Sequence, residues 1–387
     1  MSDSLLVINA GSSSIKFAVY AVDGTDLTLK VKGQIENIGG AARFHAGTCK
    51  EDIAAASHAE AMAHLTAWLG RQSELGTLLA VGHRVTHGGS GHARPVLVDD
   101  QVLEELRGLI SLAPLHQPHN ISGIDAVRRS GGLPSVACFD TAFHVTQDEL
   151  VKRFALPRRL YDEGVRRYGF HGLSYDYISH HLAREMPELH RGKVLVAHLG
   201  NGASLCAMEA GRSVETSMGF SALDGLCMGT RCGRIDPGVL LYLMQSRHMD
   251  GKMLEDLLYR ESGLLGLSGI SHDMRTLVES SSPDAQMAVA YFVHHLNREV
   301  GALVATLGGI DCLVFTGGIG ENSRAVRAGF ARKAGWLGIE VSATANDANA
   351  TCISTPASRI PVLVIPTDEE HMIAHQTLAV VQGRPLD

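Results

Sequence analysis

Apolar runs separated by short polar turns open the chain. Leu5–Ile8 and Ile15–Tyr20 flank the small polar segment Asn9–Ser14, and the turn Asp23-Gly24 follows them. Runs of this length, bounded by Gly, Ser and Asn, are typical of β-strands joined in a hairpin. The pattern therefore predicts a hairpin at the start of a mixed sheet.

Segments with helical spacing alternate with further short apolar runs. We expect helices at Ala54–Leu69, Asp99–Leu112, Ala285–Leu307 and Thr367–Val380, with Gly308-Gly309 ending the third. We expect more strands at Leu78–Gly82, Ser135–Phe139, Cys312–Thr316 and Val362–Ile365. Strands that alternate with helices place the chain in the α/β class.

A second hairpin pattern begins at Lys193. The segment KVLVAHLGNGASLCAMEAGR has the same order of apolar runs and polar turns as SLLVINAGSSSIKFAVYAVDG, and a shift of 189 residues places Gly11 on Gly200 and Asn9 on His198. Two domains of like topology with a cleft between them are one interpretation. A chance similarity between two hairpins is the other.

The length of 387 residues also suits two domains. We expect an N-terminal domain over 1–150, to which the C-terminal helix 367–387 could belong, and a C-terminal nucleotide-binding domain over 151–387. The boundary would fall near residues 150–190, where the charged segment KRFALPRRLYDEG lies.

Composition excludes several classes of function. A net charge of -7 without any basic block argues against nucleic-acid binding, which needs clustered Lys and Arg. The seven Cys are scattered and lack a CxxC pair, which favours a thiol-reducing compartment. The first residues do not have the pattern of a signal peptide, and the longest apolar stretches, such as Val300–Ile310, are too short to span a bilayer. These features predict a cytoplasmic protein that does not bind membranes.

Gly-containing loops follow several of the apolar runs. They are Asn9–Ser14, His198–Gly202, Gly317–Asn322 and, less regularly, Gly82–Gly91. Backbone N–H groups exposed by Gly, together with Ser and Asn side chains, form concave anion sites. One such loop is more often structural, but four in one chain favour a clamp for nucleotide phosphates. Neither the Walker A spacing nor a Rossmann GxGxxG is present.

Cationic side chains also occur beside Gly and small residues. Lys16, Arg84, Arg231 and Arg275 are the candidates, and Arg84 in GHRVTHGG and Arg231 in MGTRCG lie in contexts that imply tight, buried loops. An average Arg is a solvated surface residue, whereas a buried one requires an anion. Phosphoryl transfer needs such cations to neutralise the charge on the transferring group.

Carboxylates in apolar or Gly-rich surroundings complete the candidates. They are Asp140, Glu321 and the pair Glu369-Glu370, although capping of the last helix explains Glu369 equally well. Mg²⁺ takes only one or two protein carboxylates, so one acid with the Asn9 amide would suffice. The adjacent pairs His180-His181 and His294-His295 lack zinc-ligand spacing. His171, in RRYGFHGLS, could donate to a transferring phosphate.

At this point the motifs match a known family. The chain resembles, over essentially its whole length, the acetate kinase family of carboxylate kinases within the actin–Hsp70–sugar kinase superfold. The resemblance rests on eleven motifs in order: VINAGSSSIKF, GHRVTHGG, APLHQP, CFDTAFH, YGFHGLSY, HLGNGAS, TSMGF, MGTRCGRIDPG, SGISHDMR, FTGGIGENS and IPTDEE.

The resemblance implies two domains of actin-like or ribonuclease H-like topology, a phosphoryl transfer from ATP to acetate, with Mg²⁺ (or Mn²⁺) as the metal, and a homodimer. It implies Asp140, Arg84, His171 and Arg231 as catalytic residues and Asn9 and Glu369 as metal contacts. It implies that Lys16, Arg84, Thr86, Leu115, Phe170 and Ala222 contact the acid. It implies that ATP or ADP is held by Ser12, Ser14, Lys16, His198, Leu199, Gly200, Asn201, Gly202, Asp273, Met274, Arg275, Gly318, Ile319, Gly320, Glu321 and Asn322.

The sequence departs from the family pattern around the expected acid pocket. Thr86 stands where Val is usual and Ala222 where Pro is usual, while Cys232 and Arg234 replace a usual Ser and Asp. Ala222 would enlarge the pocket and Thr86 would make one wall more polar. Because one methylene changes affinity by only about 1–3 kcal/mol, propionate or another short acid competes with acetate as the substrate.

Asp140 has two interpretations. A carboxylic acid is already ionised at pH 7 and hardly needs a base. Asp140 is therefore better read as a residue that orients an Arg than as a proton shuttle.

Two other activities of the superfold remain as alternatives, a kinase for neutral hydroxyl groups and an ATPase switch. The switch would need a peptide-binding domain, for which this length leaves no room.

Overall fold

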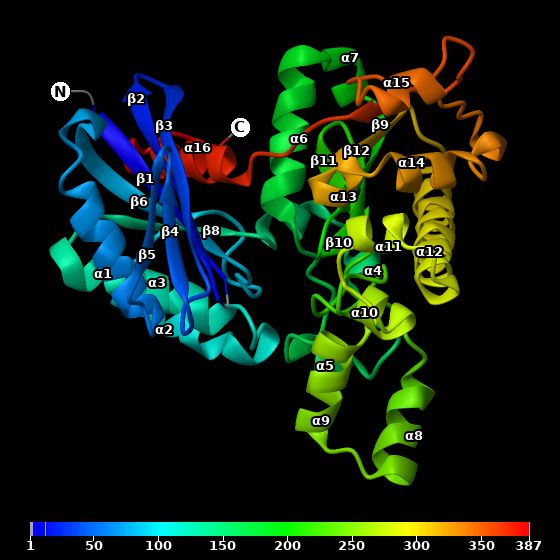
Figure 1. Ribbon diagram of the computed structural model, residues 1–387, viewed down its shortest axis with the longest axis horizontal. Helices are drawn as coiled ribbons and strands as arrows, with labels where there is room; N and C mark the ends of the chain where they lie inside the picture. Colours follow the sequence, from blue (N-terminus) through cyan, green and yellow to red (C-terminus); the bar gives the residue numbers. More distant parts are fainter. Residues whose placement is uncertain (1–2, 12, 387) are drawn as a thin grey trace. The chain divides into compact units, whose positions relative to one another are not determined.

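The chain folds into two compact units. The structure is a computed structural model that describes residues 3–11 and 13–386. The first unit comprises Met1–Phe143 with Asp368–Asp387, and the second comprises His144–Thr367. The C-terminal helix, red in Figure 1, thus packs with the N-terminal strands, in blue.

The first unit is built on a mixed sheet of eight strands. The strand order is β5-β4-β3-β2-β1-β6-β8-β7, with β1, β6 and β8 parallel to one another. Its strands are β1 (Asp3–Ala10), β2 (Ile15–Asp23), β3 (Asp26–Glu36), β4 (Ala42–Ala46), β5 (Cys49–Ile53), β6 (Thr77–Val85), β7 (Val96–Leu97) and β8 (Ser135–Phe139).

Helices cover both faces of this sheet. They are α1 (His58–Leu69), α2 (Asp100–Gly108), α3 (Gln117–Gly131) and α16 (Glu369–Val381). Because side chains alternate along a strand, Leu6 packs in the core shared with α1, whereas Leu5 packs against Leu378 of α16. The α16 face is tight at Gly82, where a Cβ would lie 2.2 Å from the Thr377 hydroxyl.

The second unit has a five-stranded sheet of order β11-β10-β9-β12-β13. Its strands are β9 (Lys193–Leu199), β10 (Ala203–Glu209), β11 (Arg212–Thr216), β12 (Cys312–Thr316) and β13 (Val362–Val364). Its helices are α4 (Glu149–Lys152), α5 (Arg158–Asp162), α6 (Gly172–Glu185), α7 (Pro187–His190), α8 (Pro237–Arg247), α9 (Gly251–Asp256), α10 (Gly263–Ser268), α11 (Met274–Glu279), α12 (Pro283–Leu307), α13 (Gly317–Asn322), α14 (Arg324–Ala331) and α15 (Ala343–Asp347).

The two sheets share one topology. In each, an antiparallel hairpin (β1–β2 or β9–β10) is extended by a third antiparallel strand, and two parallel strands follow on the other side of the first strand. β1 ends at Ala10 and β9 at Leu199, the positions that the shift of 189 residues superimposes. The predicted α/β class with two domains of like topology is confirmed.

Several element boundaries differ from the predictions. The first helix begins at His58 rather than Ala54, because the Ser57 side chain accepts a hydrogen bond from Glu60 N and caps it. The segment Gly317–Asn322, expected as a loop, is the short helix α13. The sequence reasoning did not identify β3–β5, α3 or α6. Across the described residues, none of the helices has both the length and the apolar character needed to cross a membrane.

Three buried histidines make the fold sensitive to acid. Burial lowers the pKa of His83 from 6.5 to about 3, and those of His87 and His144 to about 4. Between these values and 6.5, the unfolded chain binds protons that the native chain does not. The free energy of unfolding therefore falls as the pH falls through this window.

We expect His83→Asn to flatten this dependence. Between pH 6 and pH 5, each buried His removes about 1 kcal/mol of stability, so the variant should lose that much less than the unmodified chain over the interval. Urea unfolding at the two pH values measures the difference. Equal losses in both proteins would contradict the prediction, whatever the stability of the variant at pH 7.

Candidate active site

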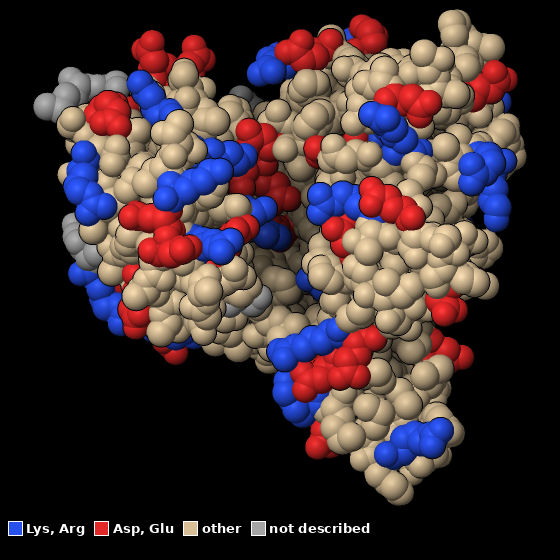
Figure 2. Space-filling view, viewed as in Figure 1, with Lys and Arg blue, Asp and Glu red and all other residues tan. Residues whose placement is uncertain are grey.

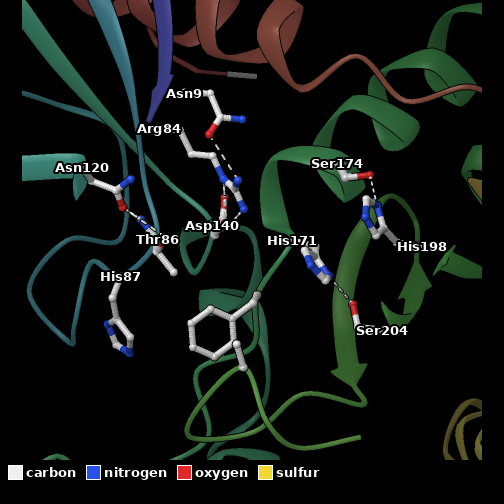
Figure 3. Close-up of polar contacts among 12 residues, drawn as sticks. Asn9, Arg84, Thr86, His87, Asn120, Asp140, His171, Ser174, His198 and Ser204 are labelled. Atoms are coloured by element: carbon white, nitrogen blue, oxygen red, sulfur yellow. Dashed lines mark hydrogen bonds and ion pairs between the residues drawn. The ribbon is translucent and has the colours of Figure 1, made fainter. Parts of the chain in front are cut away.

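Three parallel strands of the first unit bring polar side chains to one edge of the sheet. Asn9 is near the end of β1, Arg84 near the end of β6, and Asp140 directly follows β8. The strands are neighbours in the order β1-β6-β8. Ligands of α/β sheets bind outside the carboxyl ends of the strands, so this edge is the natural place for a substrate. Figure 3 shows the Arg84 guanidinium between Asn9 and Asp140.

Asp140 holds the Arg84 guanidinium in a fixed orientation. Arg84 Nε donates to Oδ1 at 3.0 Å and to Oδ2 at 3.2 Å, and its terminal NH2 donates to Oδ2 at 2.6 Å. NH1 donates to Asn9 Oδ1 at 3.3 Å. Among the described residues these contacts use three of the five N–H groups, which leaves one on each terminal nitrogen. Those two groups can bind an anion.

Negative charge around Arg84 keeps it ionised. The Arg84 side chain is 21% exposed and that of Asp140 only 2%. Burial alone would lower the pKa of Arg84, but Asp140, with Glu369 and Glu370 further away, raises it above its ordinary value. Asp140 is thus the carboxylate that fixes the Arg84 side chain in this structure, and its role in catalysis stays a prediction.

The last helix brings a second acidic group to the first unit. Glu370 forms an ion pair with Lys32 Nζ at 2.8 Å, and the Asp368 carboxylate lies 3.6 Å from the same atom. Asp368 also caps α16 by accepting from His371 N. Capping and pairing therefore account for Asp368 and Glu370, whereas Glu369 interacts with Arg84 through its charge.

The Thr86 hydroxyl is engaged within the first unit. Asn120 Oδ1 accepts hydrogen bonds from both the Thr86 N–H and the Thr86 Oγ1, each at 3.0 Å, and Asn120 Nδ2 donates to Ala10 O at 2.9 Å. Thr86 is buried, and Figure 3 shows its hydroxyl turned to Asn120. Thr86 therefore makes this wall of the expected acid pocket less polar than its residue type suggests, because its hydroxyl already donates to Asn120.

We expect Thr86→Val to leave the preference between acids almost unchanged. Valine keeps the shape, and Asn120 Oδ1 keeps the backbone N–H as a donor, so only one neutral hydrogen bond is lost. The cost in stability is about 1 kcal/mol. The ratio of kcat/KM for acetate and propionate should stay within about threefold of the unmodified ratio. A tenfold change in that ratio would show that the hydroxyl itself contacts the acid.

The remaining residues of the first unit that were predicted to contact the acid or the nucleotide lie in different parts of it. Lys16 is exposed on β2, where it pairs in register with Asn9. Ser14 O accepts a hydrogen bond from Gly11 N at 2.8 Å, which closes the turn of the hairpin. Leu115 is half-buried. Ser12 lies outside the described residues.

A second group of polar residues lies at the start of the second unit's sheet. His171 Nδ1 is 2.8 Å from the Ser204 hydroxyl, and His198 Nδ1 is 2.8 Å from the Ser174 hydroxyl. The two imidazole rings stack with centroids 4.4 Å apart. Figure 3 shows each ring directed to its serine. His171 adopts a left-handed backbone conformation with a φ of 59°, a strained state for a residue with a side chain.

Gly202 brings His171 and Arg231 together. A Cβ on Gly202 would lie 3.0 Å from His171 Nε2 and 3.8 Å from Arg231 NH1. Arg231 NH1 also donates to the Ala222 carbonyl at 3.3 Å. Two predicted catalytic side chains therefore flank one glycine, and the backbone there is open only because that residue has no side chain. Phe170, which was predicted to contact the acid, is buried in the core of this unit.

A cavity of about 910 Å³ lies in the second unit. It gathers residues from three of the stretches predicted to hold ATP. The first two stretches contribute Gly200, Asn201, Asp273, Met274 and Arg275. The third contributes Gly318, Ile319 and Asn322. His272, Ser323 and Arg324 line it as well, though the sequence reasoning did not include them. The volume is within the range of sites for nucleotide-sized ligands.

Other residues predicted to hold ATP have structural contacts instead. Leu199 is fully buried in the core. Glu321 Oε1 accepts hydrogen bonds from Gly317 N at 2.9 Å and from Thr367 N at 3.2 Å. That carboxylate therefore fixes the start of α13 and the end of the second unit. Neither Leu199, Glu321 nor Gly320 is among the described residues that line the cavity.

Three neutral residues that hydrogen-bond candidate side chains were not predicted from the sequence. Asn120, Ser174 and Ser204 each hydrogen-bond a candidate side chain. Asn120 follows the motif APLHQP by two residues, and Ser174 lies inside YGFHGLSY, so both were near signals already noticed. Ser and Asn are common in turns and helix caps, so their type alone did not distinguish them.

The Asn9 amide and the Glu369 carboxylate offer oxygen atoms of the kind that Mg²⁺ takes as ligands. Across the described residues, no three His, Cys, Asp or Glu side chains cluster as a metal site. Mg²⁺ needs only one or two protein oxygens besides water and phosphate. The Asn9 amide oxygen and the Glu369 carboxylate, both near Arg84, provide that kind of ligand set.

The comparisons with known proteins agree with one another. The sequence model of the Acetokinase family matches residues 4–375. An acetate kinase from Methylocella silvestris is 52% identical, with 98% of each chain covered, and one from Nitrobacter hamburgensis is 49% identical over 99% of this chain and 97% of that one.

Solved structures show the same relationship. A propionate kinase from Francisella tularensis has a TM-score of 0.91 at 36% identity, covering 97% of this chain and 99% of that one. An acetate kinase from Porphyromonas gingivalis has a TM-score of 0.87 at 34% identity, covering 98% and 100%. With a paired Arg84–Asp140 at the edge of one sheet and a nucleotide-sized cavity beside the other, the chain belongs to the acetokinase family.

Proposed function

We propose that this protein is an acetate kinase, which transfers the γ-phosphoryl group of ATP reversibly to the carboxylate of acetate. The products are acetyl phosphate and ADP. The observation that carries the proposal is Arg84, which is oriented by Asp140 and retains an N–H group on each terminal nitrogen. A guanidinium in this state suits a small carboxylate. The similarity to acetate kinases along the whole chain supports the same activity.

The main obstacle to the reaction is repulsion between two anions. Acetate arrives ionised, and the γ-phosphoryl group is also negative. Arg84 would bind and position the acid, while His171 and Arg231 would neutralise the transferring group during in-line transfer. No general base is needed.

The nucleotide would occupy the cavity beside the second sheet. Gly200, Asn201 and Gly318 offer backbone and amide groups at its wall, in loops of the kind that cradle phosphates. Mg²⁺, or Mn²⁺ in its place, would be held by Asn9 and Glu369 and would neutralise charge on the phosphates. Lys16 and Ser14 would assist from the first hairpin.

The choice of acid is tested directly by comparing rates, because acetate and propionate differ by only one methylene. A hydroxylamine trap with ATP, Mg²⁺ and acetate, propionate or butyrate detects the acyl phosphate directly. We expect acetate to give the highest kcat/KM. A tenfold higher value for propionate would instead assign the chain to the propionate kinases, of which the Francisella protein is an example.

A homodimer in the cytoplasm is the assembly that we propose. Helix α8 exposes several apolar side chains, among them Leu241 at 55% and Tyr242 at 51%. The surface over α8 carries few charges on the face seen in Figure 2. Exposed apolar patches of this kind mark protein interfaces. Sedimentation should give a dimer for the unmodified chain and a monomer for Leu241→Asp.

A further inference from the structure

The first unit contains a second cavity, and none of the described residues that line it is assigned above to substrate or nucleotide. It measures about 460 Å³. The end of α1 and the turn after it form one side, with Leu69 and Gly76 at its wall. The sheet forms the floor through Leu6 of β1 and Val81 of β6, and Val127 of α3 closes another side.

The chemistry of the lining selects the ligand. None of the described residues that line this cavity carries a charge. Its polar side chains include Thr66 and Gln72, and both make hydrogen bonds within their own segment: Thr66 Oγ1 donates to Met62 O at 2.9 Å and Gln72 Nε2 to Trp68 O at 3.4 Å. A phosphate or a carboxylate would lose its hydration here without a compensating partner. An uncharged, apolar molecule would lose nothing.

The size of the cavity also points to a ligand. The cavity is partly open to solvent and is not an enclosed void. Its volume of about 460 Å³ lies within the range of about 300–1,000 Å³ that small-molecule sites occupy. An apolar occupant would displace water from the apolar walls and gain dispersion contacts with them.

The floor of the cavity is connected to the candidate active site through two strands. Leu6 and Val81 are register partners in the parallel pair β1–β6. Asn9 lies three residues further along β1 and Arg84 three residues further along β6. Three residues of strand span about 10 Å. A ligand that packs on Leu6 and Val81 would therefore restrain the two strands that carry Asn9 and Arg84.

From these observations we infer that this cavity is a regulatory site for an uncharged, apolar small molecule of roughly the size of a substituted naphthalene. The occupant contacts β1 and β6 from the side opposite to α16 and alters the binding of the acid at Arg84. The regulatory part rests on the proposed role of Arg84, whereas the binding part stands without it.

The uncharged fluorescent probe N-phenyl-1-naphthylamine tests the binding part with the full chain. We expect saturable binding of one probe per chain that saturating acetate and ADP do not displace. Thr66→Trp, at an exposed position on the rim, should fill the entrance and weaken binding at least tenfold. Ala67→Trp, exposed on the next position of the same helix and outside the lining, should bind the probe normally.

Three results would overturn the binding part: no saturable binding, equal binding by the two variants, or displacement of the probe by acetate and ADP. Circular dichroism of both variants shows whether each is folded. For the regulatory part, a saturating concentration of the probe should change the KM for acetate at least twofold in the unmodified chain and in Ala67→Trp. An unchanged KM with the probe bound would overturn that part alone.

Discussion

Asp140→Asn is expected to lower kcat/KM for acetate by about 10²–10³-fold across the whole accessible pH range. The substitution removes the negative charge beside Arg84. It also allows an amide nitrogen, which cannot accept a hydrogen bond, to replace the Asp140 Oδ2 that now accepts from Nε and NH2 of Arg84. The guanidinium would then lose its fixed orientation toward the acid. Initial rates of acyl phosphate formation between pH 6 and pH 9 measure the effect.

The shape of the pH profile separates the two roles considered for Asp140. An orienting carboxylate loses activity equally at every pH, whereas a proton shuttle would lose it on one limb only. Asp125→Asn is the matched control, because Asp125 also pairs with an arginine of the first unit, Arg107, at 3.2 Å. That variant should keep nearly full activity, since the pair is more exposed and lies on α3 and α2.

Gly202→Ala is expected to reduce kcat by about 10²-fold while leaving the fold intact. The new methyl group would lie 3.0 Å from His171 Nε2, closer than carbon and nitrogen normally approach, and 3.8 Å from Arg231 NH1. The His171 side chain must shift by a few tenths of an ångström to admit it, whereas Arg231 NH1 would be at an ordinary contact distance. Single-turnover rates with saturating ATP and acetate report the loss.

A second glycine of the same unit provides the comparison. Gly335 has no atom within 4 Å of its Cβ position and an ordinary backbone conformation, so Gly335→Ala should behave like the unmodified chain. If Gly202→Ala keeps full kcat, then His171 does not need its present position for transfer. A loss of kcat accompanied by a lower melting temperature would instead mean that the methyl group disturbs the sheet.

The ion pair between Arg84 and Asp140 illustrates what could be predicted from residue types. Arg84 lies between Gly and apolar residues, and Asp140 follows an apolar strand, so both were candidates for a buried, charged site before any coordinates existed. Asp140 was expected to orient an arginine, but local patterns could not show that this arginine is Arg84, because 56 residues separate the two along the chain. It arises from the parallel pairing of β6 with β8, which sets Arg84 opposite Cys138.

Other features were not predicted for different reasons. In β3, Leu27, Leu29 and Val31 alternate with polar residues, a period-two signal that was present but overlooked, whereas β4 and β5 have only five residues each. The helix α13 is only six residues long and rich in glycine, and its glycines suggested a loop. Glu321, expected at ATP, instead bonds to Gly317 N and Thr367 N, a partner 46 residues away.

The sequence by itself determined the class of fold, the two related hairpins and the residues that could neutralise phosphate and carboxylate, because periodicity, glycine and charge are local properties. Only the tertiary structure decided which of those residues meet. It joined Arg84 to Asp140 and Asn9, set His171 and Arg231 about Gly202, and turned the Thr86 hydroxyl to Asn120. The register of parallel strands and the space left by one missing side chain are long-range quantities, which no local pattern encodes.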